Sequence, residues 1–109
     1  MGTYEDLQEI VRNKCRITWH DDETDARVKN ITEDAVSYLH HKLGMPGGIS
    51  PDPFLEQGTT RMLFENRCLY EWNDVTDEFE ENYKREILTE RHRYEVEAAK
   101  VEDETADIQ

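Results

Sequence analysis

The fold is decided by the stretch DPFLEQGTTRMLFENRCLYEWNDVTDEFEENYKREI, residues 52–87, which has the densest apolar pattern in the chain and contains all three Phe. Its large side chains recur every three or four residues, which places them on one face of a helix with about 3.6 residues per turn. That face must be buried, so the chain is predicted to be all-α. The face consists of Phe64, Cys68, Trp72, Val75, Phe79, Tyr83 and Ile87.

We expect one long helix over about residues 53–99, bent near Asn73 and Asp74, because these two residue types favour caps over helix interiors. Two alternatives are a break there with a restart near Thr76, and a start only after Gly58, since Gly costs about 1 kcal/mol relative to Ala inside a helix. An unbroken helix would be roughly 70 Å long, and a second helix of about 20 residues would cover only ~30 Å of it. The distal part would then have no cover within the chain.

Two further helices are predicted to complete a small bundle. Thr3 can cap a short N-terminal helix over residues 4–14. An amphipathic second helix over residues 24–43 ends at Gly44, the residue type favoured just past a helix C-terminus. Residues 45–53 hold all three Pro and form a loop that reverses the chain. The core positions that we predict are Leu39, Leu43, Phe64, Trp72, Phe79, Tyr83 and Ile87.

Between the first two helices, residues 16–21 are predicted to form an extended connector. Its apolar side chains, Ile17 and Trp19, alternate along the chain, and both are expected to tuck under the bundle. A single strand here would have no pairing partner, so the segment is a connector and not part of a sheet.

The last part of the chain has few apolar residues among many acids. We therefore expect one helical domain over residues 1–93 and an acidic, flexible tail over residues 94–109. Ordering such a tail costs ~1 to 2 kcal/mol of backbone entropy per residue, which its few apolar groups cannot offset without a partner. The candidate partner-binding residues are the apolar ones in this tail, Tyr94, Val96, Val101 and Ile108.

The charge of the chain limits its partners. The formal net charge of the 109 residues is -13, with -3 in residues 1–50 and -10 in residues 51–109. This balance argues against gripping DNA by its phosphates and against anchoring on an anionic membrane surface. No signal peptide and no apolar run of about 18 residues is found, so the protein is expected to be soluble and intracellular when made.

One group of residues has the side chains of a metal site but not the spacing. When the calcium-binding EF-hand pattern is started at Asp21, Ala26 and Thr32 fall where that loop needs Gly and Glu. Capping of the second helix is the better interpretation, and no metal or cofactor is expected. The group consists of His20, Asp21, Asp22 and Asp25.

The sequence does not favour catalysis either. Cys15 and Cys68 would need a nearby base, and the four scattered His supply no recognisable arrangement. In a reducing cytosol the two thiols are expected to be small core residues and not a disulfide. We name no catalytic residue and expect the protein not to be an enzyme.

Three segments together resemble the small head–tail connector proteins of long-tailed bacteriophages: EDLQEIVRNKCRI, ITEDAVSYLHHKLG and RCLYEWNDVTDEFEENYKREI. The family pattern is a first helix ending in Cys-Arg-Ile or Leu-Arg-Ile, an amphipathic second helix closing on Gly and a loop of Pro and Gly. A long helix follows, with Arg-x-x-Tyr-x-x-Asn and then Phe-x-x-Asn-Tyr. In this chain these phrases are Cys15-Arg16-Ile17, Leu43-Gly44, Arg67 to Tyr70 to Asn73, and Phe79 to Asn82-Tyr83.

The resemblance implies a structural virion protein at the head–tail interface, made in the cytoplasm of the bacterial host. It would form a homo-oligomeric ring, usually of about twelve copies, between the portal protein and the next head-closure or tail protein. The ring would extend the channel through which DNA passes without specific binding. In this family the C-terminal segment commonly contacts the portal, which assigns that role to Tyr94 to Gln109.

Two functions from other classes stand beside the connector. One is an acidic regulatory or antitoxin-like protein that binds a single basic protein partner. The other is a helix-turn-helix DNA-binding module, which is disfavoured because the helix over residues 24–43 has no basic stripe. The antitoxin-like reading predicts a monomer or small dimer, whereas the connector predicts self-association around a portal.

Overall fold

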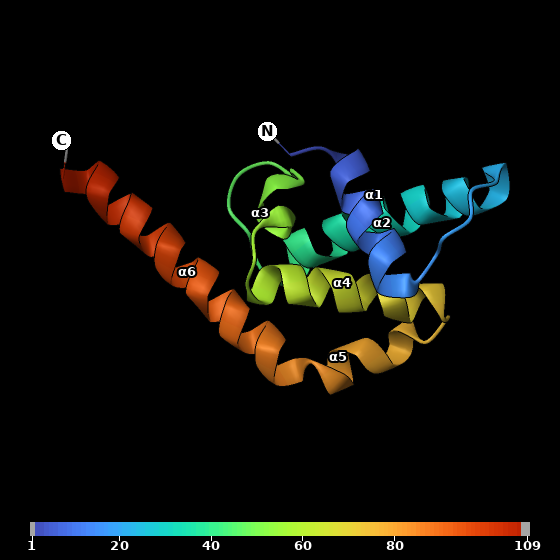
Figure 1. The fold of residues 1–109 in the computed structure, drawn as a ribbon. Coiled ribbons are helices and arrows are strands. Elements are labelled where there is room, and N and C mark those ends of the chain that lie inside the picture. Colours follow the sequence, from blue (N-terminus) through green and yellow to red (C-terminus); the bar gives the residue numbers. More distant parts are fainter. Residues whose placement is uncertain (1, 108–109) are drawn as a thin grey trace.

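The computed structural model describes residues 2–107 of the chain and the side chains of residues 2–100. This part of the chain is all-α and contains no strand, as the apolar periodicity predicted. Figure 1 shows a compact body from which the last helix departs. The elements in chain order are α1 (Tyr4–Cys15), α2 (Asp22–Lys42), α3 (Asp52–Leu55), α4 (Thr59–Trp72), the 3₁₀ turn η1 (Thr76–Glu78), α5 (Phe79–Asn82) and α6 (Lys84–Asp107).

The body is built on three helices that pack on one another: α1, α2 and α4. Each contributes fully buried aliphatic or aromatic side chains, and burial of a Leu or Phe side chain contributes about 1.5 to 3 kcal/mol. Short α3 closes one end of this core by placing Phe54 against Phe64, with 5.6 Å between the ring centroids. The central residues are Leu7, Val11, Val28, Leu39, Leu63, Phe64 and Cys68.

The first helix starts as its sequence predicts. Thr3 and Asp6 form a capping box in which each side chain accepts a hydrogen bond from the other residue's backbone N–H, satisfying two donors that a helix leaves free. The second helix begins two residues earlier than predicted, because Asp21 accepts the backbone N–H of Thr24 at 2.7 Å. Asp21 therefore has a structural role as the cap of α2.

Three helices end in the same way. After α2, Gly44 takes a left-handed conformation (φ 64°), and Met45 N–H donates to His40 C=O at 3.0 Å. The same pattern of hydrogen bonds closes α1 at Arg16 and α4 at Asp74, both with φ 58°. This arrangement, the Schellman motif, satisfies carbonyls that would otherwise lack donors at the helix end.

The prediction of one long helix is wrong. The chain breaks at Gly58 (φ 146°), again at Asn73 and Asp74, and a third time at Tyr83. Both alternatives, a start after Gly58 and a restart near Thr76, agree with the structure. At the second break the chain reverses, so that η1, α5 and the first part of α6 return along α4.

The reversal also corrects the expectation that the distal apolar residues lack cover within the chain. Phe79 is fully buried and Ile87 is 4% exposed, because both lie on the returning segment that packs against the body. Leu39, Leu43 and Phe64 are fully buried as well, whereas Trp72 and Tyr83 are only partly buried at the edge of the core. One chain thus covers most of its own apolar stripe.

The connector between α1 and α2 differs from the prediction at one of its two apolar residues. Ile17 is buried, but the side chain of Trp19 remains 49% exposed. Its indole N–H donates to Thr24 Oγ1 at 3.1 Å, on the first turn of α2 and away from the core. The expectation that both residues tuck under the bundle is therefore wrong for Trp19.

Candidate functional site

The last helix, α6, is the element that leaves the body. It is 24 residues long, about 36 Å at ~1.5 Å per residue, and its first part contacts α4 and α5. Figure 1 shows its second part running away from the other helices, which gives the molecule its 55 Å long dimension. Within the described residues, no helix combines the length and the apolar content that a bilayer crossing requires.

A small polar cluster, buried except for its Arg, ties the first half of α6 to α4. We call it the α6 clasp and define it as Thr60 on α4 with Glu90, Arg93 and Tyr94 on α6. Thr60 Oγ1 donates to Glu90 Oε2 and lies 2.7 Å from the hydroxyl oxygen of Tyr94. Thr60, Glu90 and Tyr94 are at most 7% exposed, so their polar atoms must find partners within the chain.

The charges of the clasp are balanced by a fork of hydrogen bonds. Arg93 Nε donates to Glu90 Oε1 at 2.9 Å and Arg93 Nη2 to Glu90 Oε2 at 3.0 Å, a two-point pairing that fits a carboxylate. These bonds from Arg93 hold the pKa of Glu90 below its usual value, against the opposing effect of burial. The carboxylate therefore stays ionised inside the clasp. Arg93 Nη1 also donates to Glu97 at 2.7 Å, one turn further along α6.

The opposite face of α6 is open. Leu88 is 57% exposed and Val96 is 40% exposed, and both are among the four large exposed apolar residues of the described chain. With His92 between them at i+4, they lie on the side of the helix away from Ile87, Glu90 and Tyr94. Isolated exposed apolar residues are ordinary on a protein surface. These two are of interest because they lie on the helix that projects from the body.

A hollow of about 530 Å³ lies where α6 diverges from the junction of α3 and α4. Its wall holds four carboxylates and one guanidinium, so it does not suit an anionic ligand. The Oδ1 atom of Asp52 on this wall also accepts the backbone N–H of Gly2 at 2.9 Å, which ties the N-terminus to α3. The charged lining residues are Asp52, Glu56, Glu90, Arg93 and Glu97.

The four predicted partner-binding residues do not share one environment. Tyr94 was expected beyond the reach of any other helix, and this is wrong, because it is 7% exposed and contacts Thr60 on α4. Val96 is exposed on the projecting part of α6. The side chains of Val101 and Ile108 lie outside the described residues. Helix α6 continues through the predicted boundary between residues 93 and 94, so no break separates the domain from its tail there.

The two cysteines have the environment of core residues. Cys68 is fully buried on α4 and Cys15 is half-buried at the end of α1. Burial raises the pKa of both thiols, that of Cys68 well above its usual value, which keeps them protonated and weakly nucleophilic. Among the described residues no group of three or more His, Cys, Asp or Glu is placed to hold a metal ion.

Sequence reasoning missed three of the four clasp residues. Glu90 and Arg93 are spaced i, i+3, so their pairing on one helix face has a sequence signal. Thr60 has none, because its contact with them spans 30 or more positions and depends on the chain reversal at Asp74. The clasp could therefore be recognised as a buried polar cluster only from the fold.

The chain matches no family model, and comparison with curated proteins and with solved structures finds none that is similar to it.

Proposed function

We propose that this protein is a structural assembly component of the small head–tail connector type, which joins a phage portal to the next head-closure or tail protein. The proposal rests first on the resemblance of its helical phrases to that family. The fold adds a physical reason, because a clamped helix that runs on past its own domain provides a surface for another protein. Such a protein works by shape and contact and needs no catalytic group.

The observation that carries the proposal is the way in which α6 is held. The clasp residues Glu90 and Tyr94 fix its first half to α4, whereas residues 95–97, 99 and 100 are exposed. The second half of α6 is acidic, and its last turn holds no Lys, Arg or His. The helix dipole favours cations at a C-terminal end, so this end lacks the charge that would stabilise it. A partner that supplies positive charge and apolar surface would stabilise it.

In the assembly that we propose, copies of the chain form a ring on the portal, and α6 of each copy contacts the portal protein. The negative charge of the chain would keep duplex DNA from adhering to the channel as it passes. The antitoxin-like alternative shares the acidic surface but predicts a small complex with one basic partner. The number of copies per complex therefore separates the two functions.

The function is tested by truncation. A chain ending at Ala99 keeps the whole clasp, including the bond from Arg93 to Glu97, and loses Lys100 to Gln109. We expect its thermal midpoint to stay close to that of the full chain while its affinity for the portal protein encoded alongside it falls at least tenfold. Full-length affinity in the truncated chain would contradict docking through α6.

A matched variant separates apolar contact from charge. Val101→Ser with Ile108→Ser keeps every charge of the full-length chain but removes two apolar groups. If the segment docks through both kinds of contact, this variant binds the portal with an affinity between those of the full-length and truncated chains. Affinity equal to the full-length value would leave charge alone as the basis of docking.

A further inference from the structure

Trp19 is an exposed aromatic residue that the structure holds in one position. About half of its side chain faces solvent, on the connector between α1 and α2. Large aromatic residues are costly to leave in water, and at protein interfaces they supply much of the binding energy at low entropic cost. An exposed Trp on a rigid segment is therefore a candidate contact for another molecule.

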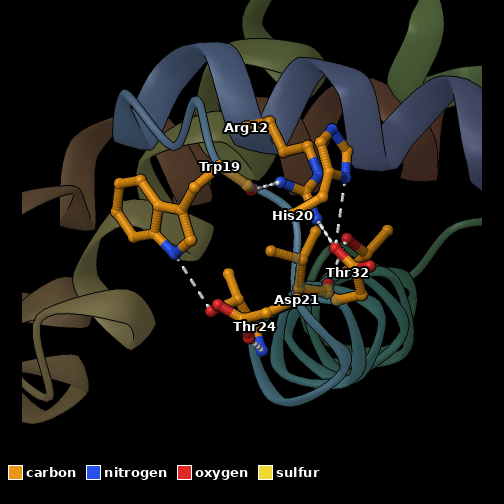
Figure 2. Close-up of polar contacts among 8 residues, drawn as sticks. Arg12, Trp19, His20, Asp21, Thr24 and Thr32 are labelled. Atoms are coloured by element: carbon orange, nitrogen blue, oxygen red, sulfur yellow. Dashed lines mark hydrogen bonds and ion pairs between the residues drawn. The ribbon is translucent and has the colours of Figure 1, made fainter.

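The rigidity comes from Arg12, a largely buried residue of α1. Arg12 Nη1 donates to the backbone carbonyl of Trp19 at 2.8 Å, and its other terminal nitrogen pairs with Asp25 on α2. Figure 2 shows Arg12 bonded to the carbonyl of Trp19, and the indole N–H of Trp19 directed at Thr24. A buried guanidinium and a side-chain hydrogen bond thus fix the backbone and the ring of an exposed residue.

The residues that follow Trp19 are acidic, whereas the exposed base Arg16 lies three residues before it. Residues 19–25 contain four carboxylates and no Lys or Arg. A hollow of about 420 Å³ lies beside the connector, between α1 and the start of α2. Its lining includes Arg12 and His20 but not Trp19 itself. Its wall carries Glu5 and Glu9, two exposed acids at i, i+4 that make no ion pair within the part of the chain that the structure describes.

We propose that Trp19 and this hollow form a docking surface for a basic segment of a partner protein. An Arg or Lys side chain of that segment stacks on the indole face, where a cation is attracted by the ring and by the nearby carboxylates. The rest of the segment lies across the connector into the hollow, where Glu5 and Glu9 accept further cations. We call Trp19, Glu5 and Glu9 the Trp19 surface.

The Trp19 surface is separate from α6. Figure 1 shows the start of α2 and the C-terminal end of α6 at opposite ends of the molecule. The inference therefore goes beyond the proposed function and does not depend on it. If both hold, the chain has two ends that bind different proteins, which a protein joining two components of an assembly requires.

The test is an NMR titration of the full-length protein. The chain has two Trp, so its spectrum contains two indole N–H signals, which Trp19→Phe assigns. The probe is a short peptide of alternating Arg and Gly at physiological salt, and a peptide of alternating Glu and Gly is the control. We expect the Arg peptide to shift the Trp19 signal more than that of Trp72, and the Glu peptide to shift neither.

Substitutions then separate the ring from the charge of the chain. Trp19→Ala keeps every charge and should weaken binding of the Arg peptide about tenfold, whereas Trp19→Phe should retain part of the affinity. Leu88→Ala removes an even more exposed apolar residue from α6 and should change nothing. Because Trp19 lies outside the core, each variant should keep the thermal midpoint of the parent protein.

A second pair of variants controls for general attraction to a negative protein. Glu5→Gln with Glu9→Gln removes two charges from the Trp19 surface, and Glu78→Gln with Glu81→Gln removes two from η1 and α5. The first pair should weaken binding several-fold and the second should not. The proposal is overturned if the full-length protein does not bind the Arg peptide, if Trp19→Ala binds it as tightly as the parent, or if both charge pairs weaken binding equally.

Discussion

A single hydroxyl group, that of Thr60, contacts both Glu90 and Tyr94 in the α6 clasp. Thr60→Val preserves the shape of the side chain but leaves two buried polar groups without this partner, which costs ~1 to 3 kcal/mol. We predict a lower urea midpoint for this variant. Thr89→Val, at an exposed position of α6, is the control and should leave the midpoint unchanged. Equal midpoints for both variants would contradict the clasp.

The carboxylate of Glu90 makes part of the stability dependent on pH. Its pKa in the folded protein is below the ordinary value of 4.5, so the folded state favours its ionised form. The resulting stability is fully present above about pH 4.5 and is lost as the pH falls through the folded pKa. We predict that the difference in unfolding free energy between the parent and Glu90→Gln is constant near neutral pH and narrows in acid. A difference that does not vary with pH would exclude this role.

Among the aromatic residues, Phe79 and not Trp72 is at the centre of the packing. Phe79 is fully buried, and its ring centroid lies 5.0 Å from that of Tyr83 and 5.6 Å from that of Tyr70. Trp72 is partly buried and covered on one face by Arg27, whose guanidinium carbon lies 4.2 Å from the ring centroid.

We therefore predict that Phe79→Ala costs ~3 to 5 kcal/mol and unfolds most of the protein, whereas Trp72→Ala lowers the denaturation midpoint by less. Urea titrations of the two variants give the comparison directly. If Trp72→Ala were the more damaging of the two, the arrangement of the aromatic core would be wrong. The sequence could place both residues on one stripe but could not rank them, because their burial depends on where the chain turns back.

At the scale of elements, the break at Asp74 predicts the order of stability of two variants. Asp74 has φ 58°, a conformation that costs an ordinary L-residue roughly 1 kcal/mol or more and costs Gly nothing. Asp74→Gly should therefore be at least as stable as the parent, and Asp74→Ala should be less stable. In a continuous helix the order would be reversed, since Ala is favoured over Gly there by about 1 kcal/mol. Urea midpoints of the two variants decide between the two structures.

The same position explains where sequence reasoning about the elements succeeded and failed. The end of α2 was predictable because Gly44 is the residue type that its left-handed cap favours. Arg16 and Asp74 adopt the same conformation without being Gly, and the apolar stripe continues in phase through Asp74. The helical period of the apolar residues continues across a reversal that keeps Phe79 and Ile87 on the buried side. The period alone therefore predicted one helix over residues 53–99, where the chain forms four α-helices, α3 to α6, and the 3₁₀ turn η1.

At the scale of the whole molecule, the reversal lets the chain bury most of its apolar stripe without a partner. The body covers its own core, and the surfaces that we propose to bind other proteins are the projecting part of α6 and the Trp19 surface. The all-α class and the first two helices were predictable from local patterns. The clasp and the exposure of Trp19 were not, because each depends on contacts between residues that lie on different elements.

We propose that α6 attaches this protein to a portal, and imaging of the complex tests this attachment most directly. The full-length protein and the chain ending at Ala99 are each mixed with the portal protein and imaged by negative-stain electron microscopy. We predict an additional layer of density on one face of the portal ring with the full-length protein and bare portal rings with the truncated chain. Bare rings in both samples, or the same added layer in both, would contradict the claim.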